Sequence, residues 1–230
     1  MSTHNTIVIG LTGPLNCGKD TVGQLLAQHC GAHVMAFADP LREEIAEAYC
    51  IEQVFLTRRD TKERPMAALA FARCLDRAFV DRMVVEFHNG ADGTLRDFLE
   101  APRSPRQIMR WWGTEYRRAN SAGYWVHRAA QRVSWLHKGR HARLVVITDV
   151  RFADEAELVH GIGGQVWQIT RPGCAAQTGQ HQSEVTGEAF SPTAVIDNAG
   201  DIRHLQQQVL SAWAAREWQI PGVRVEVPAQ

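Results

Sequence analysis

The chain has 230 residues, 45% of them hydrophobic, and its 25 lysines and arginines balance its 25 aspartates and glutamates. This length predicts one α/β domain with a proper core and makes two separate enzymes improbable. The balanced charge gives no overall field to hold a nucleic acid polymer, although a local patch remains open, and it suits a small anionic substrate better.

The first predicted element is an apolar strand over 6–11, followed at once by the run Gly13-Pro14-Leu15-Asn16-Cys17-Gly18-Lys19. This run fits the glycine-x4-glycine-lysine loop, in which inward-turned backbone amides and a helix N-terminus cradle phosphates while the lysine reaches the transferring group. A chance glycine-rich turn would also fit these letters, but the strand before it and the amphipathic helix 18–30 after it supply the required context. The motif predicts binding of a nucleoside triphosphate.

The residue after Lys19 departs from the usual rule, which places serine or threonine there as a Mg²⁺ ligand. This chain has Asp20 and only then Thr21. A carboxylate could hold Mg²⁺ directly or through water, because such sites combine a carboxylate with phosphates and waters. Which of the two residues is the direct ligand stays open at this point.

Farther along, apolar β-rich runs alternate with helix-period segments, which is typical of a parallel sheet with crossover helices. The predicted strands are 33–37, 144–148, 165–170 and 193–196, and the predicted helices are 40–50, 122–137, 152–160 and 201–216. We expect a P-loop NTPase fold in which residues 1–230 form one α/β domain around a parallel sheet of about five strands. A charged helical stretch over 52–120, with a helical segment from Ala67 to His88, is interpreted as a substrate-binding insertion, and the polar residues 171–192 as a lid-like segment.

Ligands of open α/β sheets bind outside the carboxyl ends of the strands, so position alone selects further site candidates. These are Asp39 and Arg42 after the second strand, Asp149 and Arg151 after the strongest strand, Arg171 after the next, and Asn198 after the last. Each also has a plain structural interpretation, such as capping a helix or facing solvent. Their joint placement on one sheet edge favours a site.

The insertion is rich in arginines, including Arg64 and Arg106, and the planar guanidinium suits bidentate phosphate recognition. Trp111, Trp112 and Trp125 could stack a base, although core packing is the expected role for at least two of them.

The motifs above, taken in order, resemble the deoxynucleoside monophosphate kinases of tailed bacteriophages. The resemblance is carried from residue 7 to about 210 by these runs: Gly18-Lys19-Asp20-Thr21, Phe37-Ala38-Asp39-Pro40-Leu41-Arg42, Ser104-Pro105-Arg106-Gln107 leading to Gly113-Thr114, Ile147-Thr148-Asp149-Val150-Arg151, Arg171-Pro172, His181-x-Ser183-Glu184 and Asp197-Asn198. It implies a nucleoside monophosphate kinase-like fold, ATP with Mg²⁺ as donor and a deoxynucleoside monophosphate as acceptor.

The resemblance also implies roles for single residues. Binding of ATP and Mg²⁺ falls to Gly13, Asn16, Gly18, Lys19, Asp20 and Thr21, with Asn198 near the adenine. Acceptor binding falls to Asp39, Arg42, Arg106, Gln107, Gly113 and Thr114, with Asp149 and Arg151 between the two nucleotides. Arg64, Trp112 and Trp125 are further acceptor-binding candidates on the residue-type arguments given above. Lys19, Asp39, Arg151 and Arg171 are the candidate catalytic residues.

Two other functions stay open at this point. The first is a P-loop kinase acting on a hydroxyl, such as a dephospho-coenzyme A kinase-like enzyme or one that modifies a hydroxymethylated base in phage DNA, where Asp39 would take the proton. The second is an ATP-binding switch without phosphoryl transfer, which has no evident need for an arginine-rich insertion.

The five cysteines have scattered spacings and no metal-ligand pattern, so we expect reduced thiols in a cytoplasmic protein, in the host cytoplasm if a phage encodes it. No apolar run approaches the roughly 20 residues needed to cross a bilayer. A homodimer is left open by the tryptophans near the C-terminus.

Overall fold

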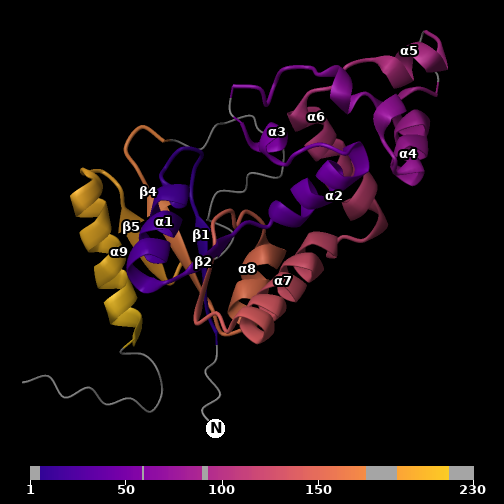
Figure 1. The fold of residues 1–230 in the computed structure, drawn as a ribbon. Coiled ribbons are helices and arrows are strands. Elements are labelled where there is room, and N and C mark those ends of the chain that lie inside the picture. Colours follow the sequence, from indigo (N-terminus) through magenta and orange to yellow (C-terminus); the bar gives the residue numbers. More distant parts are fainter. Residues whose placement is uncertain (1–5, 59, 90–92, 175–190, 218–230) are drawn as a thin grey trace, which may run out of the picture. The chain divides into compact units, whose positions relative to one another are not determined.

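Strands and helices alternate along the chain, and the strands form one parallel sheet (Figure 1). The computed structural model describes residues 6–58, 60–89, 93–174 and 191–217. The chain divides into two compact units, one made of Met1–Phe37 with Ala130–Gln230 and the other of Ala38–Ala129. Most of the predicted lid-like segment 171–192, including His181 and Glu184, lies outside the described residues.

The sheet of the first unit has the order β2-β3-β1-β4-β5, and every neighbouring pair is parallel. Its strands are β1 (Ile7–Thr12), β2 (His33–Met35), β3 (Leu144–Ile147), β4 (Gln165–Thr170) and β5 (Ala194–Asp197). The fully buried β3, together with β1, forms the middle of the sheet, as their uninterrupted apolar runs require. The prediction of a P-loop α/β fold with about five parallel strands is confirmed.

Helices cover both faces of this sheet (Figure 1). On one face, α1 (Lys19–Cys30) and α9 (Ile202–Glu217) place Leu26 and Val209 in one buried cluster with Ile9 and Ile169. On the other face lie α8 (Ala153–Gly161) and the second half of α7 (Tyr124–Arg140). Within the described part of the chain, no helix is long and apolar enough to cross a membrane.

The second unit is built from helices and contains the predicted insertion 52–120. Its elements are α2 (Asp39–Tyr49), α3 (Val54–Thr57), the short 3₁₀ turns η1 (Ala67–Leu69) and η2 (Phe71–Arg73), α4 (Arg77–Phe87), α5 (Leu95–Glu100), α6 (Pro105–Arg110), the π-helical η3 (Trp111–Arg118) and the start of α7. Its core is aromatic: the Phe79 ring lies 4.5 Å from the Trp112 ring and 5.8 Å from the Phe71 ring, measured between centroids.

Side-chain caps fix where α4 and α6 begin. Asp76 accepts a hydrogen bond from the Phe79 amide and starts α4, while Ser104 and Gln107 form a reciprocal capping box that starts α6 at Pro105. Each cap satisfies amides that have no partner within the helix.

The expected helical segment from Ala67 to His88 is the main difference from the sequence-based fold. Ala67 to Arg73 form two separate 3₁₀ turns, and the α-helix begins only at Arg77. Met66 pairs with Arg103 in an isolated antiparallel bridge, and Ala70 and Cys74 have extended backbones. Tertiary pairing and the Asp76 cap therefore override the helical propensity of the alanines.

Candidate functional site

The loop between β1 and α1 has the backbone shape that a phosphate cradle requires. Gly13, Asn16 and Gly18 have φ values of 135°, 63° and 108°. A β-carbon on Gly13 would lie 2.3 Å from the Ile169 carbonyl oxygen, so only glycine fits there. The loop leads directly into α1, whose free N-terminal amides and dipole favour an anion.

Lys19 is held over this loop by the backbone itself. Its Nζ donates hydrogen bonds to the carbonyl oxygens of Gly13 and Pro14, both at 2.7 Å, and lies 3.8 Å from Cys17 Sγ. Burial raises the pKa of the Cys17 thiol, an effect that the nearby Lys19 partly offsets. At neutral pH the thiol is therefore uncharged, and the full positive charge of Lys19 is available to a phosphate.

Asn198, which directly follows the edge strand β5, holds the phosphate loop in place through hydrogen bonds. Its backbone amide donates to the Thr170 carbonyl, and its Nδ2 donates to the Cys17 carbonyl, each at 2.8 Å. Gly18 leaves room for this contact, because a β-carbon there would lie 2.4 Å from Asn198 Nδ2. The side chain predicted to lie near the adenine thus contacts the phosphate loop directly.

The carboxyl end of β3 supplies the next candidates. Asp149 follows the strand, and its Oδ1 accepts a hydrogen bond of 2.6 Å from the Phe37 amide. The side chain of Glu155, which is only 3% exposed, accepts hydrogen bonds from the Arg151 and Phe152 amides at 2.8 and 3.2 Å. Arg151 and Arg171 are exposed. Glu155 therefore fixes the backbone that presents Arg151, a role for which its position four residues later was the only sequence signal.

Asp20 and Thr21 lie in the first turn of α1, where Asp20 is exposed and Thr21 half-buried. Their oxygens are hard donors of the type that Mg²⁺ prefers. Among the described residues, no three His, Cys, Asp or Glu side chains gather into a metal-binding group. This donor set fits an ion held jointly with phosphates and water.

In the second unit, Asp39 and Arg42 lie at the start of α2. Arg42 Nη1 donates to Asp39 Oδ1 at 2.8 Å, and both side chains keep partial exposure. Arg42 Nε is buried without a hydrogen-bond partner. Because Nε is buried, only the exposed part of this guanidinium is open to a ligand oxygen.

Several other residues that were predicted to bind the phosphoryl acceptor have structural roles in this unit. Gln107 Oε1 accepts from the Ser104 amide in the α6 cap, and Arg106 pairs with Glu63 at an exposed position near the exposed Arg64. The rings of Trp112 and Trp125 are 1% and 5% exposed. Core packing, the expected role for at least two of the tryptophans, is what these two rings do.

The short run Gly113-Thr114 lies in the π-helical segment η3. Gly113 is buried, with its carbonyl accepting a hydrogen bond of 3.1 Å from Trp125 Nε1, and Thr114 is exposed. π-Helical turns recur at functional sites because they displace side chains from the regular helical positions.

Glu44 is the residue of this unit that sequence reasoning missed. Its Oε2 accepts hydrogen bonds from Trp112 Nε1 at 2.9 Å and Arg117 Nε at 2.7 Å, and its Oε1 accepts one from the Tyr124 hydroxyl and lies 3.8 Å from Arg128 Nε. The Glu44 side chain is 12% exposed. One carboxylate thus joins α2, η3 and α7. Burial lowers the pKa of Arg117, but the hydrogen bond and the charge of Glu44, with smaller contributions from Tyr124 and Tyr116, together outweigh burial and raise it.

No family model matches the chain. A protein of Acanthamoeba polyphaga mimivirus named "Putative deoxynucleotide monophosphate kinase" is 31% identical over 212 residues, covering 89% of this chain and 95% of that protein. A dephospho-CoA kinase of Synechococcus is 29% identical over 103 residues, covering 41% of this chain and 42% of that protein. Dephospho-CoA kinase from Campylobacter jejuni aligns in structure with a TM-score of 0.45 and 13% identity, covering 91% of this chain and 96% of that chain.

The match to the mimivirus protein spans nearly the whole of both chains. The chain belongs to the family of P-loop kinases that this mimivirus protein represents.

Proposed function

We propose that the protein is a deoxynucleoside monophosphate kinase, which transfers the γ-phosphoryl group of ATP to a deoxynucleoside monophosphate and releases the diphosphate. The full-length relation to the mimivirus protein carries this proposal, because that protein bears the name of this activity. The resemblance of the ordered motifs to phage enzymes supports the same acceptor.

The donor site in this proposal is the first unit. The amides of the loop from Gly13 to Gly18 and the N-terminus of α1 bind the ATP phosphates, and Lys19 neutralises charge on the transferring group. Asp20 and Thr21 would hold Mg²⁺, which supplies further neutralisation of phosphate charge when bound. Asn198 keeps the loop closed around the phosphates through its hydrogen bond to the Cys17 carbonyl.

The acceptor site draws on the second unit. Arg42 is partly exposed and would donate to a phosphate oxygen, and Asp39 orients it. An ionised acceptor phosphate is already a nucleophile at neutral pH, so in-line positioning and charge neutralisation are sufficient and no general base is required.

A coupled assay of ADP release from ATP and Mg²⁺ tests the proposal, with deoxynucleoside and ribonucleoside monophosphates offered in turn. We expect turnover with at least one deoxynucleoside monophosphate, and its loss by more than about 1000-fold in Lys19→Ala, because the charge-neutralising group is gone. Lys138→Ala, which removes an exposed lysine elsewhere, is the matched control and should turn over normally. Inactivity of the native enzyme with every monophosphate would defeat the assignment.

A kinase acting on a hydroxyl is the second candidate, favoured by the partial match to a dephospho-CoA kinase. There Asp39 would accept the proton of the hydroxyl. The carboxylate is already occupied by Arg42, which suits a binding role better than that of a base. In Asp39→Asn, a collapse of turnover with unchanged acceptor affinity would favour the hydroxyl reaction, whereas weakened acceptor binding would favour the monophosphate.

A further inference from the structure

The charge of this neutral chain is unevenly distributed. From residue 116 to 148 the sequence contains seven arginines and lysines and no aspartate or glutamate. Much of this segment is α7, whose second half belongs to the sheet-containing unit. The chain as a whole has no net charge that would attract a polyanion. This segment is locally basic and can attract one.

We name as the α7 basic face the exposed residues Arg132, Trp135, Lys138 and Arg140 of this half-helix, together with Arg143, which lies just after the helix. All five residues are exposed, and Trp135 is 49% exposed. Lys138, Arg140 and Arg143 form no salt bridge with any described residue. Among the residues that the structure describes, these cations therefore have no internal counter-charge.

Trp135 is the distinctive member of this face. The guanidinium carbons of Arg132 and Arg140 lie 5.6 and 5.3 Å from the centroid of its ring. Cations in the last turn of a helix are commonly explained by the helix dipole, to which each contributes about 0.3–1 kcal/mol. The dipole does not explain a large indole left in solvent between two arginines, because burying such a ring is strongly favourable.

We propose that the α7 basic face binds single-stranded nucleic acid, with a base stacked on Trp135 and its guanidinium neighbours and the flanking phosphates paired with Arg132, Lys138, Arg140 and Arg143. Aromatic rings and arginine planes accept any base, and cations beside them follow the phosphate backbone. Arg132 and Arg140 are eight residues apart, about 12 Å along a helix, so the face accommodates a short run of nucleotides.

Charge and shape together select this partner. A membrane-surface helix buries a continuous apolar side in lipid, but the apolar side of this helix, with Val133 and Leu136, is already in the protein core. An acidic peptide would match the charge but would leave the planar Trp135 stack without a planar ligand. Nucleic acid, unlike an acidic peptide or a lipid surface, supplies both phosphates and flat aromatic groups in succession along one chain.

Fluorescence anisotropy of a 5′-labelled oligothymidylate of about 12 nucleotides, titrated with the full chain, measures this binding directly. Saturating ATP and Mg²⁺ are included so that the phosphate loop does not compete. For about four phosphate contacts, we expect a plot of log affinity against log salt with a slope of about −3. Lys138→Gln combined with Arg140→Gln should bring this slope to about −1.5, because two contacts are lost.

Trp135→Ala tests the stacking term separately. We expect it to weaken binding by about 5- to 100-fold at unchanged salt slope, and to have no effect on binding of an abasic oligomer of equal length. Arg203→Gln, an exposed arginine in the first turn of α9, is the matched control and should bind like the native chain. Thermal midpoints within about 2 °C of the native value show that each variant is folded.

Three results would overturn the proposal. The first is no binding at 50 mM salt, and the second is equal affinity for the native chain and both α7 variants. The third is equal or tighter binding of polyglutamate or of phosphatidylserine vesicles, which would assign the face to an acidic protein or to a membrane.

Discussion

Gly18 is a position at which a single β-carbon should be costly. Its φ of 108° is a conformation that side chains rarely adopt, and the added atom would meet Asn198 Nδ2 at 2.4 Å. We expect Gly18→Ala to lower the free energy of unfolding by at least about 2 kcal/mol and to weaken ATP binding by more than tenfold, because the loop amides lose their orientation. Urea titration and calorimetric ATP binding measure the two effects.

Gly31 provides the matched comparison, since its φ is 67° and nothing lies within 4 Å of its β-carbon position. Gly31→Ala should cost about 1 kcal/mol from backbone strain and leave ATP affinity unchanged. Adding Asn198→Ala to Gly18→Ala removes the collision but also the hydrogen bond to the Cys17 carbonyl that holds the loop, so the free energy of unfolding should recover in part while ATP binding stays weak. Equal ATP affinity in Gly18→Ala and the native chain would contradict this account of the loop.

Cys74 should make the protein sensitive to alkali. Burial raises the pKa of its thiol from 9.0 to about 11. Above pH 9 the unfolded chain loses this proton while the folded chain keeps it, so the unfolded state binds fewer protons and stability falls as pH rises toward 11. From pH 8 to 10.5 we expect the free energy of unfolding to fall by about 2 kcal/mol from this thiol alone.

Urea titrations of the reduced protein at both pH values measure this loss. Cys74→Ala should have a flatter profile by that amount, whereas Cys50→Ala, which removes an exposed thiol, should follow the native profile. Parallel profiles for all three proteins would exclude Cys74 as the cause.

At the level of elements, predictability follows the range of the interactions that form each one. The β1 strand, the phosphate loop and α1 were predicted within about a residue, because period, glycine positions and flanking elements agree locally. The segment from Ala67 to Arg73 was not, because its backbone is decided by the bridge from Met66 to Arg103, far along the chain. No local sequence pattern predicts such a pairing.

The same limit on predicting long-range contacts applies to side chains, as Glu44 shows. The contacts of Glu44 lead to a testable prediction. Its carboxylate is the shared acceptor of donors from η3 and α7. Glu44→Gln replaces an ionised acceptor and leaves Arg117 without its closest charge partner, so we expect a loss of about 1–3 kcal/mol in the free energy of unfolding. Thermal or urea unfolding at pH 7 measures it.

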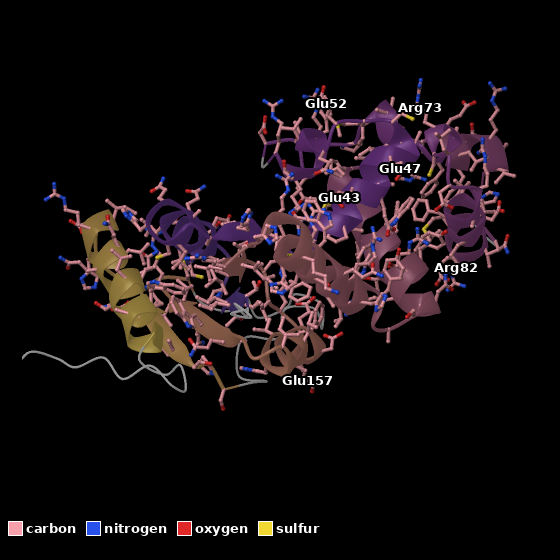
Figure 2. All side chains as sticks on the ribbon, turned by 60° about the horizontal axis from the view of Figure 1, so that its bottom comes forward. Glu43, Glu47, Glu52, Arg73, Arg82 and Glu157 are labelled. Carbon is pink, nitrogen blue, oxygen red and sulfur yellow. The ribbon has the colours of Figure 1, made fainter. Side chains whose placement is uncertain are left out.

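Glu47→Gln is the control within the same helix. Glu47, labelled in Figure 2, lies three residues later and is exposed, so its loss should cost at most about 0.5 kcal/mol. Similar costs for both variants would mean that the Glu44 network contributes no more than a solvated surface charge.

For the whole molecule, the candidates fall into two sets that coincide with the two compact units. Gly13, Lys19, Asp149 and Asn198 belong to the sheet-containing unit, and Asp39 and Arg42 to the helical one. The rule that ligands bind at strand ends selected most of these residues from sequence, but it could not show that Asn198 reaches Cys17 across 181 residues. Contacts of that range depend on the order of strands in the sheet, which sequence pattern alone left open.

This division predicts separate footprints for the two substrates in amide hydrogen exchange. ATP with Mg²⁺ should slow exchange in peptides covering 13–22 and 194–198, because the proposed donor site contains the loop and Asn198 contacts the loop. An accepted deoxynucleoside monophosphate should slow exchange mainly over 39–46 and 104–114, because ligand binding suppresses local opening of the backbone that it contacts. In Lys19→Ala we expect the first footprint to weaken and the second to persist. A monophosphate footprint confined to residues 13–22 would instead mean that both nucleotides compete for the phosphate loop, and it would remove the helical unit from the acceptor site.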